Sequence, residues 1–206
     1  MEVIRILEGD SHYPSQLSVC LGEDAPPTLS YIGNIDLLRS QPLALFCSNK
    51  CPGSLILQTY DLAQQLREAG RPVISGFHSP VERECLNILL RGNGPLIVCP
   101  ARGLERMRIP KEYEEPLNQK RLLLLSPFSE KVRRADSGTA ATRNAVVAAL
   151  AQDVFVAHAE VGSKTETLCC EIISWRKPLF TFEDMANNRL LASGAKPVAQ
   201  TSFCKT

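Results

Sequence analysis

The sequence has no long apolar run, no CxxC pair and no strong excess of charge of one sign. No apolar stretch approaches the length that crosses a membrane, and the N-terminus MEVIRILEGD carries acidic residues early, without a cleavable-signal pattern. The formal net charge is +1, so any affinity for nucleic acid must come from a local patch of positive charge. We therefore expect a soluble, cytoplasmic protein that does not bind membranes.

The eight cysteines and three histidines show no zinc-ligand spacing. Most of the cysteines lie in apolar or helical surroundings, where a reduced thiol acts as a small hydrophobic side chain. Only Cys47 and Cys51, close to Lys50, approach the electropositive setting that makes a thiol reactive. We expect structural thiols, no bound metal and no cofactor.

The length of 206 residues, with 44% hydrophobic and 22% charged residues, suits one sizeable core. Residues 1–40 are expected to be an N-terminal extension that packs on a domain formed by residues 41–206. Apolar strands alternate with helical segments along that domain. This order predicts an α/β, Rossmann-like fold, a doubly wound and mostly parallel sheet with helices on both faces. We expect strands at 42–48, 73–75, 96–100, 122–126, 154–159, 178–182 and 196–198, and helices at 54–70, 79–91, 139–151, 166–175 and 187–193.

The most informative stretch is ISGFHSPVE, residues 74–82, where a short strand ends and a capped helix begins. Ser79 suits the N-cap position, Pro80 the first turn, and Glu82 completes a capping box. The first-turn amides should then face a ligand beyond the strand end, and an anion is the ligand that a helix N-terminus favours. The residues of this turn that we expect at the site are Ser75, Gly76, Phe77 and His78.

The same strand-to-helix change recurs twice. The strand at 42–48 ends in a polar loop, and the strand at 154–159 runs into a turn that precedes another helix. In a doubly wound sheet such turns lie at the carboxyl ends of parallel strands, and those beside the switch point line a crevice. A ligand with phosphates is the expected occupant. The turn residues are Ser48, Asn49 and Lys50 in the first loop, and Gly162, Ser163 and Lys164 in the second.

Two further segments are polar and irregular. Residues 102–121 mix prolines with charge and predict a long loop that contains a short helix, and long loops often carry function. Residues 128–137 hold Lys131, Arg133 and Arg134, a basic run that we interpret as a solvated loop.

The order of these landmarks resembles the DprA/Smf DNA-processing proteins, whose core is a Rossmann-like domain related to the LOG proteins. The resemblance covers most of the chain. The matching segments are Tyr13-Pro14, Pro26-Pro27, ALFCSNK (44–50), Ser75-Gly76, Gly94 to Leu104, Ile109-Pro110-Lys111, Arg143-Asn144, Gly162-Ser163-Lys164 and LLASGA (190–195).

Several positions depart from the family pattern. Cys47 and Asn49 stand where the family has glycine and a phosphate-gripping arginine, with Lys50 as the nearest substitute. Pro80-Val81-Glu82 replaces a GID triplet, and Ala145 replaces the second arginine of RNR. We expect a divergent, pared-down member without a winged-helix tail.

The resemblance implies binding of single-stranded DNA, a homodimer and the loading of a RecA-type recombinase, with no established catalysis. Such binding needs cations for the phosphates and surfaces on which bases stack. Besides the turn residues above, the candidates are Arg102, Lys111, Arg143 and Asn144, with Phe77 and His78 for stacking.

Two other functions remain open on the sequence. A nucleotide-binding sensor or a LOG-like nucleotide hydrolase would need only one phosphate site built from backbone amides. The LOG signature PGGxGTxxE is not reproduced, however, so binding is favoured over hydrolysis. The third reading is an interaction module that kept the fold and lost its ligand.

Overall fold

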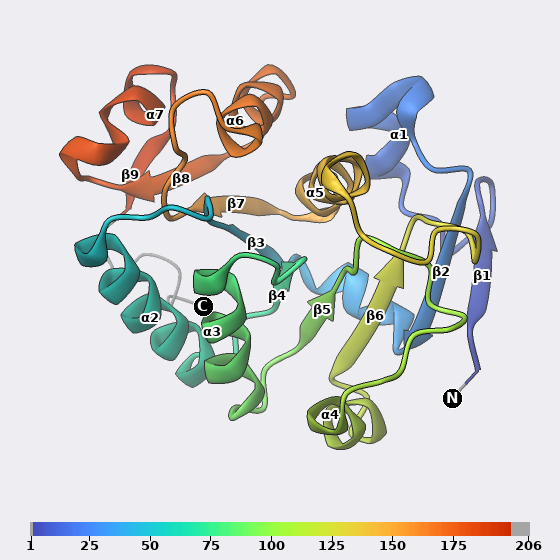
Figure 1. Cartoon of the computed structure of the whole chain (residues 1–206). Helices are drawn as coiled ribbons and strands as arrows, with labels where there is room; N and C mark the ends of the chain where they lie inside the picture. Colours follow the sequence, from blue (N-terminus) through green and yellow to red (C-terminus); the bar gives the residue numbers. More distant parts are fainter. Residues whose placement is uncertain (1, 199–206) are drawn as a thin grey trace.

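The computed structural model describes residues 2–198. Within that range nine strands form one sheet, in the order β1-β2-β6-β5-β4-β3-β7-β8-β9 (Figure 1). The seven strands from β3 onward run parallel, whereas β1 and β2 are antiparallel to their neighbours. The strands are β1 Ile4–Leu7, β2 Thr28–Gly33, β3 Leu43–Phe46, β4 Val73–Ser75, β5 Leu96–Val98, β6 Leu122–Ser126, β7 Asp153–Val156, β8 Leu179–Phe182 and β9 Lys196–Val198.

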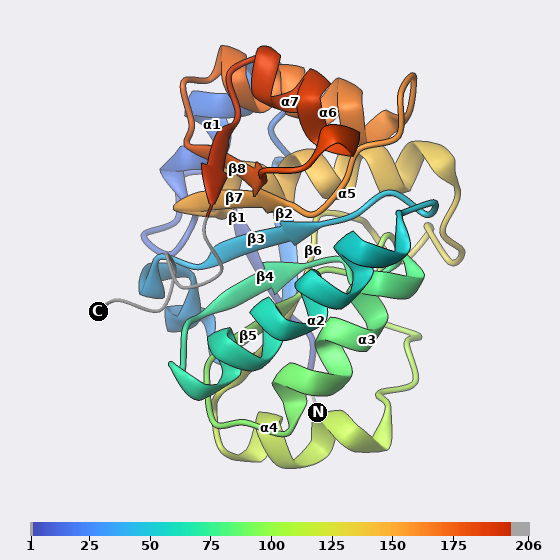
Figure 2. The same ribbon diagram turned by 90° about the vertical axis from the view of Figure 1, so that its left-hand side faces the viewer.

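Helices cover both faces of this sheet, as the two views at right angles show (Figures 1 and 2). The pair α2 and α3 lies on one face, and α1, α5, α6 and α7 lie on the other. The α-helices are α1 Ser15–Leu21, α2 Gly53–Glu68, α3 Pro80–Leu90, α4 Glu114–Asn118, α5 Ser137–Leu150, α6 Lys164–Ser174 and α7 Asn188–Ala192. Four 3₁₀ turns, η1 Gly22–Asp24, η2 Ile35–Ser40, η3 Lys111–Tyr113 and η4 Met185–Asn187, complete the described elements.

The central strands are apolar along their whole length because both of their faces are covered. In β6 all five residues, Leu122 to Ser126, are buried, and alternate side chains enter the two separate cores on either side of the sheet. Leu122 and Leu124 join the core under α2 and α3, whereas Leu123 and Leu125 join the core under α5 and α6. The predicted α/β, Rossmann-like fold is confirmed.

The order of the strands creates one switch point. From β3 the chain moves outward through β4, β5 and β6, and it then returns to place β7 on the other side of β3. The loops that follow β3 and β7 therefore diverge to opposite sides of the sheet at adjacent strand ends. In such folds the crevice for a ligand lies between these loops.

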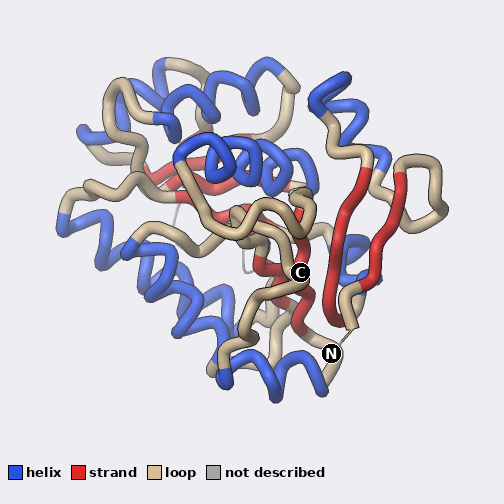
Figure 3. Tube along the Cα trace, turned by 45° about the vertical axis from the view of Figure 1, so that its right-hand side comes forward, coloured by secondary structure: helices blue, strands red, loops and turns tan. Residues whose placement is uncertain are grey.

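The N-terminal strands extend the sheet beyond β6. β2 pairs with β6 and β1 pairs with β2, so they form the edge of the sheet that the tube drawing brings forward (Figure 3). The sequence analysis did not identify these strands or α1. No helix among residues 2–198 is long and apolar enough to cross a membrane.

Candidate nucleic-acid interface

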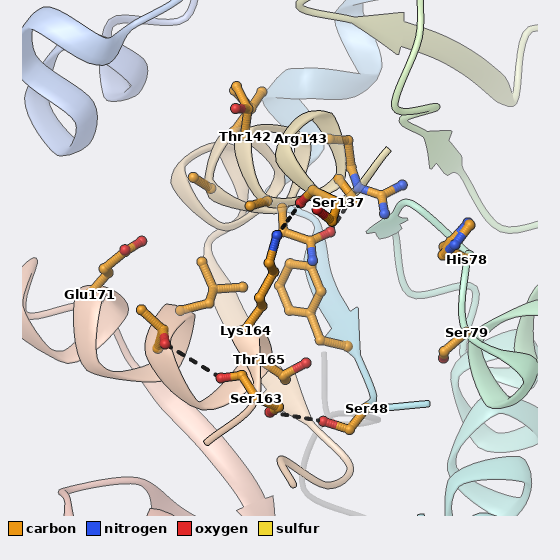
Figure 4. A pocket seen from close by; sticks show the side chains of 18 of the residues that line it. Ser48, His78, Ser79, Ser137, Thr142, Arg143, Ser163, Lys164, Thr165 and Glu171 are labelled. Carbon is orange, nitrogen blue, oxygen red and sulfur yellow. Dashed lines mark hydrogen bonds between the residues drawn. The ribbon is translucent and has the colours of Figure 1, made fainter. Parts of the chain in front are cut away.

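A crevice of about 1170 Å³ lies at the switch point. It opens between the loops after β3 and β7 and continues along α5 and α6 (Figure 4). Trp175, which directly follows α6, also lines it. Of the residues expected from the sequence, seven line it: Ser48, Asn49, His78, Arg143, Asn144, Ser163 and Lys164. These seven residues come from four separate segments of the chain.

Hydrogen bonds join the loops after β3 and β7 across the floor of the crevice. The Ser48 amide donates to the His158 carbonyl at 2.9 Å, and the Glu160 amide donates to Ser48 Oγ at 3.0 Å. Ser48 Oγ also lies 3.3 Å from Ser163 Oγ, the N-cap oxygen of α6. Figure 4 shows these two hydroxyl groups facing each other. The floor is thus fixed by the protein itself.

The N-terminus of α3 differs from the site expected there. The predicted capping box of Ser79 and Glu82 is confirmed. The Glu82 carboxylate, however, accepts hydrogen bonds from the amides of His78 at 2.8 Å and, across the crevice floor, of Cys47 at 2.9 Å. The buried Glu82 carboxylate therefore binds the His78 amide at the position where the sequence analysis expected a ligand.

The N-terminus of α6 keeps free donors. Glu166 accepts from the Gly162 amide at 2.7 Å, but the amides of Lys164 and Thr165 have no hydrogen-bond partner within residues 2–198. Thr165 and Lys164 both line the crevice. The helix dipole and these amides favour an anion at this end of α6. Anion binding therefore fits α6 better than α3.

Lys164 spans the crevice from α6 to α5. Its Nζ donates to the Ser137 carbonyl in the first turn of α5 (Figure 4). Asp136 caps that helix by accepting from the amides of Gly138 and Thr139, both at 2.8 Å, and these hydrogen bonds lower the pKa of the Asp136 carboxyl. The Lys164 ammonium is exposed, so a phosphate can replace its contact with the carbonyl at little cost.

Arg143 lies beneath the crevice and is 2% exposed. Its Nη1 donates to the Cys99 carbonyl at 2.8 Å, and its Nε donates to Asn144 Oδ1 at 2.7 Å. Burial lowers the pKa of the guanidinium, and the nearby Glu82 carboxylate opposes that change. The Nη2 group has no hydrogen-bond partner within the described chain, and Figure 4 shows the Arg143 side chain on the side of α5 that faces His78. Arg143 is first a structural cation, with one edge directed at the crevice.

Three expected residues lie elsewhere for identifiable reasons. Phe77 is 5% exposed and packs in the core with Leu45 and Val81, so its ring is not available for stacking on a base. Lys50 extends into solvent and forms an ion pair with Glu160 at 3.1 Å. Lys111 lies in η3, which leads into α4 at the opposite edge of the sheet (Figure 1).

The other expected turn residues do not line the crevice, and the expected Arg102 lies in the loop after β5, also outside it. Ser75 is buried and its Oγ accepts from the Phe77 amide, Gly76 packs against Arg143, and Gly162 is exposed outside the crevice. The sequence analysis missed the crevice residues Asp136, Ser137, Thr165 and Trp175. A capping signal, Asp136 three residues before Thr139, could have placed the start of α5 correctly.

The charges that line the crevice are mixed. Lys164 and Arg143 face five carboxylates, of Asp24, Glu82, Asp136, Glu160 and Glu171. Glu82 and Asp136 are bound to backbone amides, and Glu160 to Lys50. No group of three or more metal-ligating side chains occurs among the described residues. The crevice suits a small number of phosphates and is not a strongly basic groove.

A mostly parallel, doubly wound sheet with a polar crevice at its switch point defines a Rossmann-like protein of the kind that holds ligands beyond its strand ends. A profile of the DNA recombination-mediator protein A family matches residues 5–204, so the chain belongs to that family. The resemblance inferred from the sequence is thereby confirmed.

Solved structures agree with this family. DNA processing protein A from Streptococcus pneumoniae is 24% identical, with a TM-score of 0.78 over 96% of this chain and 71% of that one. DNA processing protein A from Helicobacter pylori, whose single-stranded DNA binding mode has been studied, is 19% identical, with a TM-score of 0.78 over 98% and 94% of the two chains.

A molybdenum cofactor binding protein from Rippkaea orientalis is 12% identical, with a TM-score of 0.56 over 80% and 93% of the chains. At these identities all three likenesses concern the fold alone. No curated protein matches the sequence.

Proposed function

We propose that this protein binds single-stranded DNA as a DNA-processing protein, with one or a few phosphates held in the crevice. The observation that carries the proposal is the open N-terminus of α6, where two free amides and the Lys164 ammonium face the crevice of a chain in this family. The side chains of Asn49, Ser163 and the largely buried Arg143 complete the polar lining. Binding by the relative from Helicobacter pylori supports the same function.

His78 is the aromatic side chain that remains for stacking at this end of the crevice. It is exposed, lines the crevice and lies opposite Lys164 in Figure 4. A base that stacks on the imidazole would contribute about 1–3 kcal/mol to binding. Trp175 lines the far end along α6, where Glu171 and Asp24 disfavour phosphates. We therefore place the phosphates at the start of α6 and a base near His78.

The test is fluorescence anisotropy of a labelled oligothymidine, titrated at several salt concentrations, with duplex DNA and AMP as competitors. We expect salt-sensitive binding for which duplex DNA competes poorly. In Lys164→Ala the affinity should fall, and the slope of log affinity against log salt should become shallower by about 0.7 for the lost phosphate contact.

The matched control for this titration is Arg91→Ala, which removes one exposed cation at the far end of α3. It should bind like the unmodified protein. Absence of binding to the oligomer would contradict the proposal. An equal loss of affinity in Lys164→Ala and Arg91→Ala would mean that the overall charge of the protein, and not the crevice, controls binding.

A nucleotide sensor or LOG-like hydrolase is the second candidate, and the mixed charge of the crevice favours it. A single phosphate needs only the free amides of α6 and one cation, whereas a nucleic-acid strand needs several cations along its backbone. Displacement of the oligomer by AMP at similar concentrations would favour this small-ligand function over the first.

The assembly and location that we propose follow from the same function. The protein would act in the cytoplasm as a homodimer that delivers bound single strands to a RecA-type recombinase. Sedimentation velocity over a range of concentrations tests the dimer. Co-sedimentation with a purified recombinase, with and without oligothymidine, tests the partner, and absence of a complex in both conditions would contradict it.

A further inference from the structure

The loops that follow β5 and β6 form one continuous surface. β5 and β6 are adjacent parallel strands, so their following loops leave the same edge of the sheet as the crevice. The Gly103 amide donates to the Val132 carbonyl at 2.9 Å, and Ser126 Oγ donates to the Arg102 carbonyl at 2.7 Å. A Cβ on Gly103 would stand 2.5 Å from the Ser129 carbonyl oxygen. The two loops are therefore closely packed and fixed.

A hollow of about 240 Å³ lies between these loops and is lined by Arg102, Arg106 and Arg133. The guanidinium groups of these three arginines form no hydrogen bond or ion pair with any residue from 2 to 198. Arg134, next in the chain, is exposed and equally unpaired within that range. We call Arg102, Arg106, Arg133 and Arg134 the arginine surface.

The acids of this region do not neutralise the arginine surface. Glu105 and Glu130 also line the hollow, but both face Arg5 of β1, at 2.7 Å and 3.9 Å. Desolvation by burial is the largest single influence on the pKa of the Glu105 carboxyl, and it raises that pKa. The hydrogen bond and the charge of Arg5, together with backbone hydrogen bonds, outweigh it, so the pKa is lowered overall. The arginine surface therefore keeps an excess of positive charge.

This surface adjoins the crevice. Arg134 directly precedes Ala135, Asp136 and Ser137, which line the crevice and reach Lys164 through the Ser137 carbonyl. Four residues span at most about 14 Å, a distance that a few nucleotides bridge. The crevice itself holds more carboxylates than cations. A polyanion that enters the crevice would find its main attraction on the neighbouring loops.

We propose that the arginine surface binds the sugar–phosphate backbone of the single strand that occupies the crevice, and that it supplies most of the salt-dependent affinity. The inference rests on the proposed function and extends it. Guanidinium groups suit phosphates because they donate several hydrogen bonds in a fixed plane and remain charged. The surface would bind the backbone without reading the bases.

The test compares Arg106→Ala/Arg133→Ala with Arg39→Ala/Arg91→Ala, a control that removes two exposed arginines at the opposite edge of the sheet. The probe is a labelled oligothymidine of about 20 nucleotides, longer than common single-strand sites. We expect the first variant to lose about tenfold in affinity at low salt. The slope of log affinity against log salt should become shallower by about 1.4, because each of the two lost phosphate contacts contributes about 0.7. The control should match the unmodified protein.

The outcomes separate the two proposals. If the unmodified protein binds the oligomer and Arg106→Ala/Arg133→Ala keeps the full salt slope, the arginine surface is not part of the path and only this inference fails. If the unmodified protein binds no oligomer, both proposals fail. A labelled duplex is the second arm: loss of duplex binding with unchanged binding of the single strand would assign the surface to duplex DNA and overturn the inference.

Discussion

Gly76 lies directly against the guanidinium of Arg143. The two are so close that a Cβ added to Gly76 would stand 1.5 Å from Arg143 Nη1. In the sequence this glycine marks a turn that could cradle an anion. In the structure it makes room for a buried cation that bonds to the Cys99 carbonyl. The glycine therefore serves the packing beneath the crevice.

The first prediction is that Gly76→Ala destabilises the fold. The added methyl group must displace the Arg143 guanidinium from a closely packed position, so the free energy of unfolding should fall by about 1–3 kcal/mol. Urea denaturation followed by circular dichroism measures the loss. The control is Gly53→Ala, where nothing lies within 4 Å of the added Cβ and the change should stay within about 0.5 kcal/mol. Equal stability of the two variants would contradict the proposed packing.

The second prediction is that Glu82→Ala creates an anion site. The amides of Cys47 and His78 lose their acceptor, which costs about 1–3 kcal/mol for each donor left without a partner. Inorganic phosphate should then occupy these amides beside Arg143 and raise the melting temperature of this variant more than that of the unmodified protein. At a phosphate concentration of about a hundred times its dissociation constant, binding would add about 2.7 kcal/mol to the free energy of unfolding of this variant. Glu84→Ala, on the same helix, is the control.

Melting curves with and without phosphate decide this prediction. The contrary result is that phosphate raises the melting temperature equally in the unmodified protein, Glu84→Ala and Glu82→Ala. That result would mean that phosphate binds elsewhere, for example at α6, and not at the amides that the Glu82 carboxylate occupies in the unmodified protein.

The third prediction concerns the two thiols of the loop after β3. The interaction between the Cys47 and Cys51 side chains lowers the pKa of the Cys51 thiol and raises that of the Cys47 thiol, which burial raises further. Cys47 is also buried, whereas Cys51 is partly exposed. At pH 8, iodoacetamide should therefore modify Cys51 before Cys47, as peptide mass spectrometry would measure. Cys47→Ala removes the side chain that lowers the pKa of Cys51 and should slow the modification of Cys51. Faster labelling of Cys47 in the unmodified protein would contradict this.

The fourth prediction is a loss of stability at alkaline pH. Burial raises the pKa of the Cys99 thiol from 9.0 to about 12, and Arg143 opposes part of that rise. Because the pKa is higher in the folded state, this contribution is fully present below pH 9 and is lost as the pH rises toward 12. The slope is about 1.4 kcal/mol per pH unit for one thiol.

Urea denaturation between pH 8 and pH 11 measures this slope. Cys99→Ala should show a shallower decline than the unmodified protein, and Cys170→Ala, which removes an exposed thiol, should not. Parallel declines in all three proteins would exclude Cys99 as a source of the alkaline sensitivity.

The parallel strands could be predicted because their apolar runs are continuous, as in LLLLS at β6, and the start of α3 could be predicted from the local signal of Ser79 and Glu82. The strands β1 and β2 were missed, since β1 has only four residues and a largely exposed pattern. The second partner of Glu82 could not be predicted, because Cys47 lies 35 residues away and only the folded sheet brings them together.

Apart from Arg102, which the sequence analysis named as a candidate, the arginine surface was missed for a related reason. Arg133 and Arg134 resemble a solvated loop in the sequence, and their importance arises only when β5 and β6 place them beside Arg102 and Arg106. Phe77 shows the reverse error, because its backbone adopts φ of +46° and the ring joins the core although the sequence places it in a turn.

The bonds of Ser48 across the crevice floor have a consequence for how a ligand is received. Since this residue joins the loop after β3 to His158, Glu160 and Ser163, that part of the site is held together by the protein's own hydrogen bonds, without a ligand. Little conformational freedom would be lost there on association, so a modest set of contacts can still give useful affinity. The protein would then behave as a preorganised receptor, in which the flexible strand, and not the fold, bears the entropic cost of the complex.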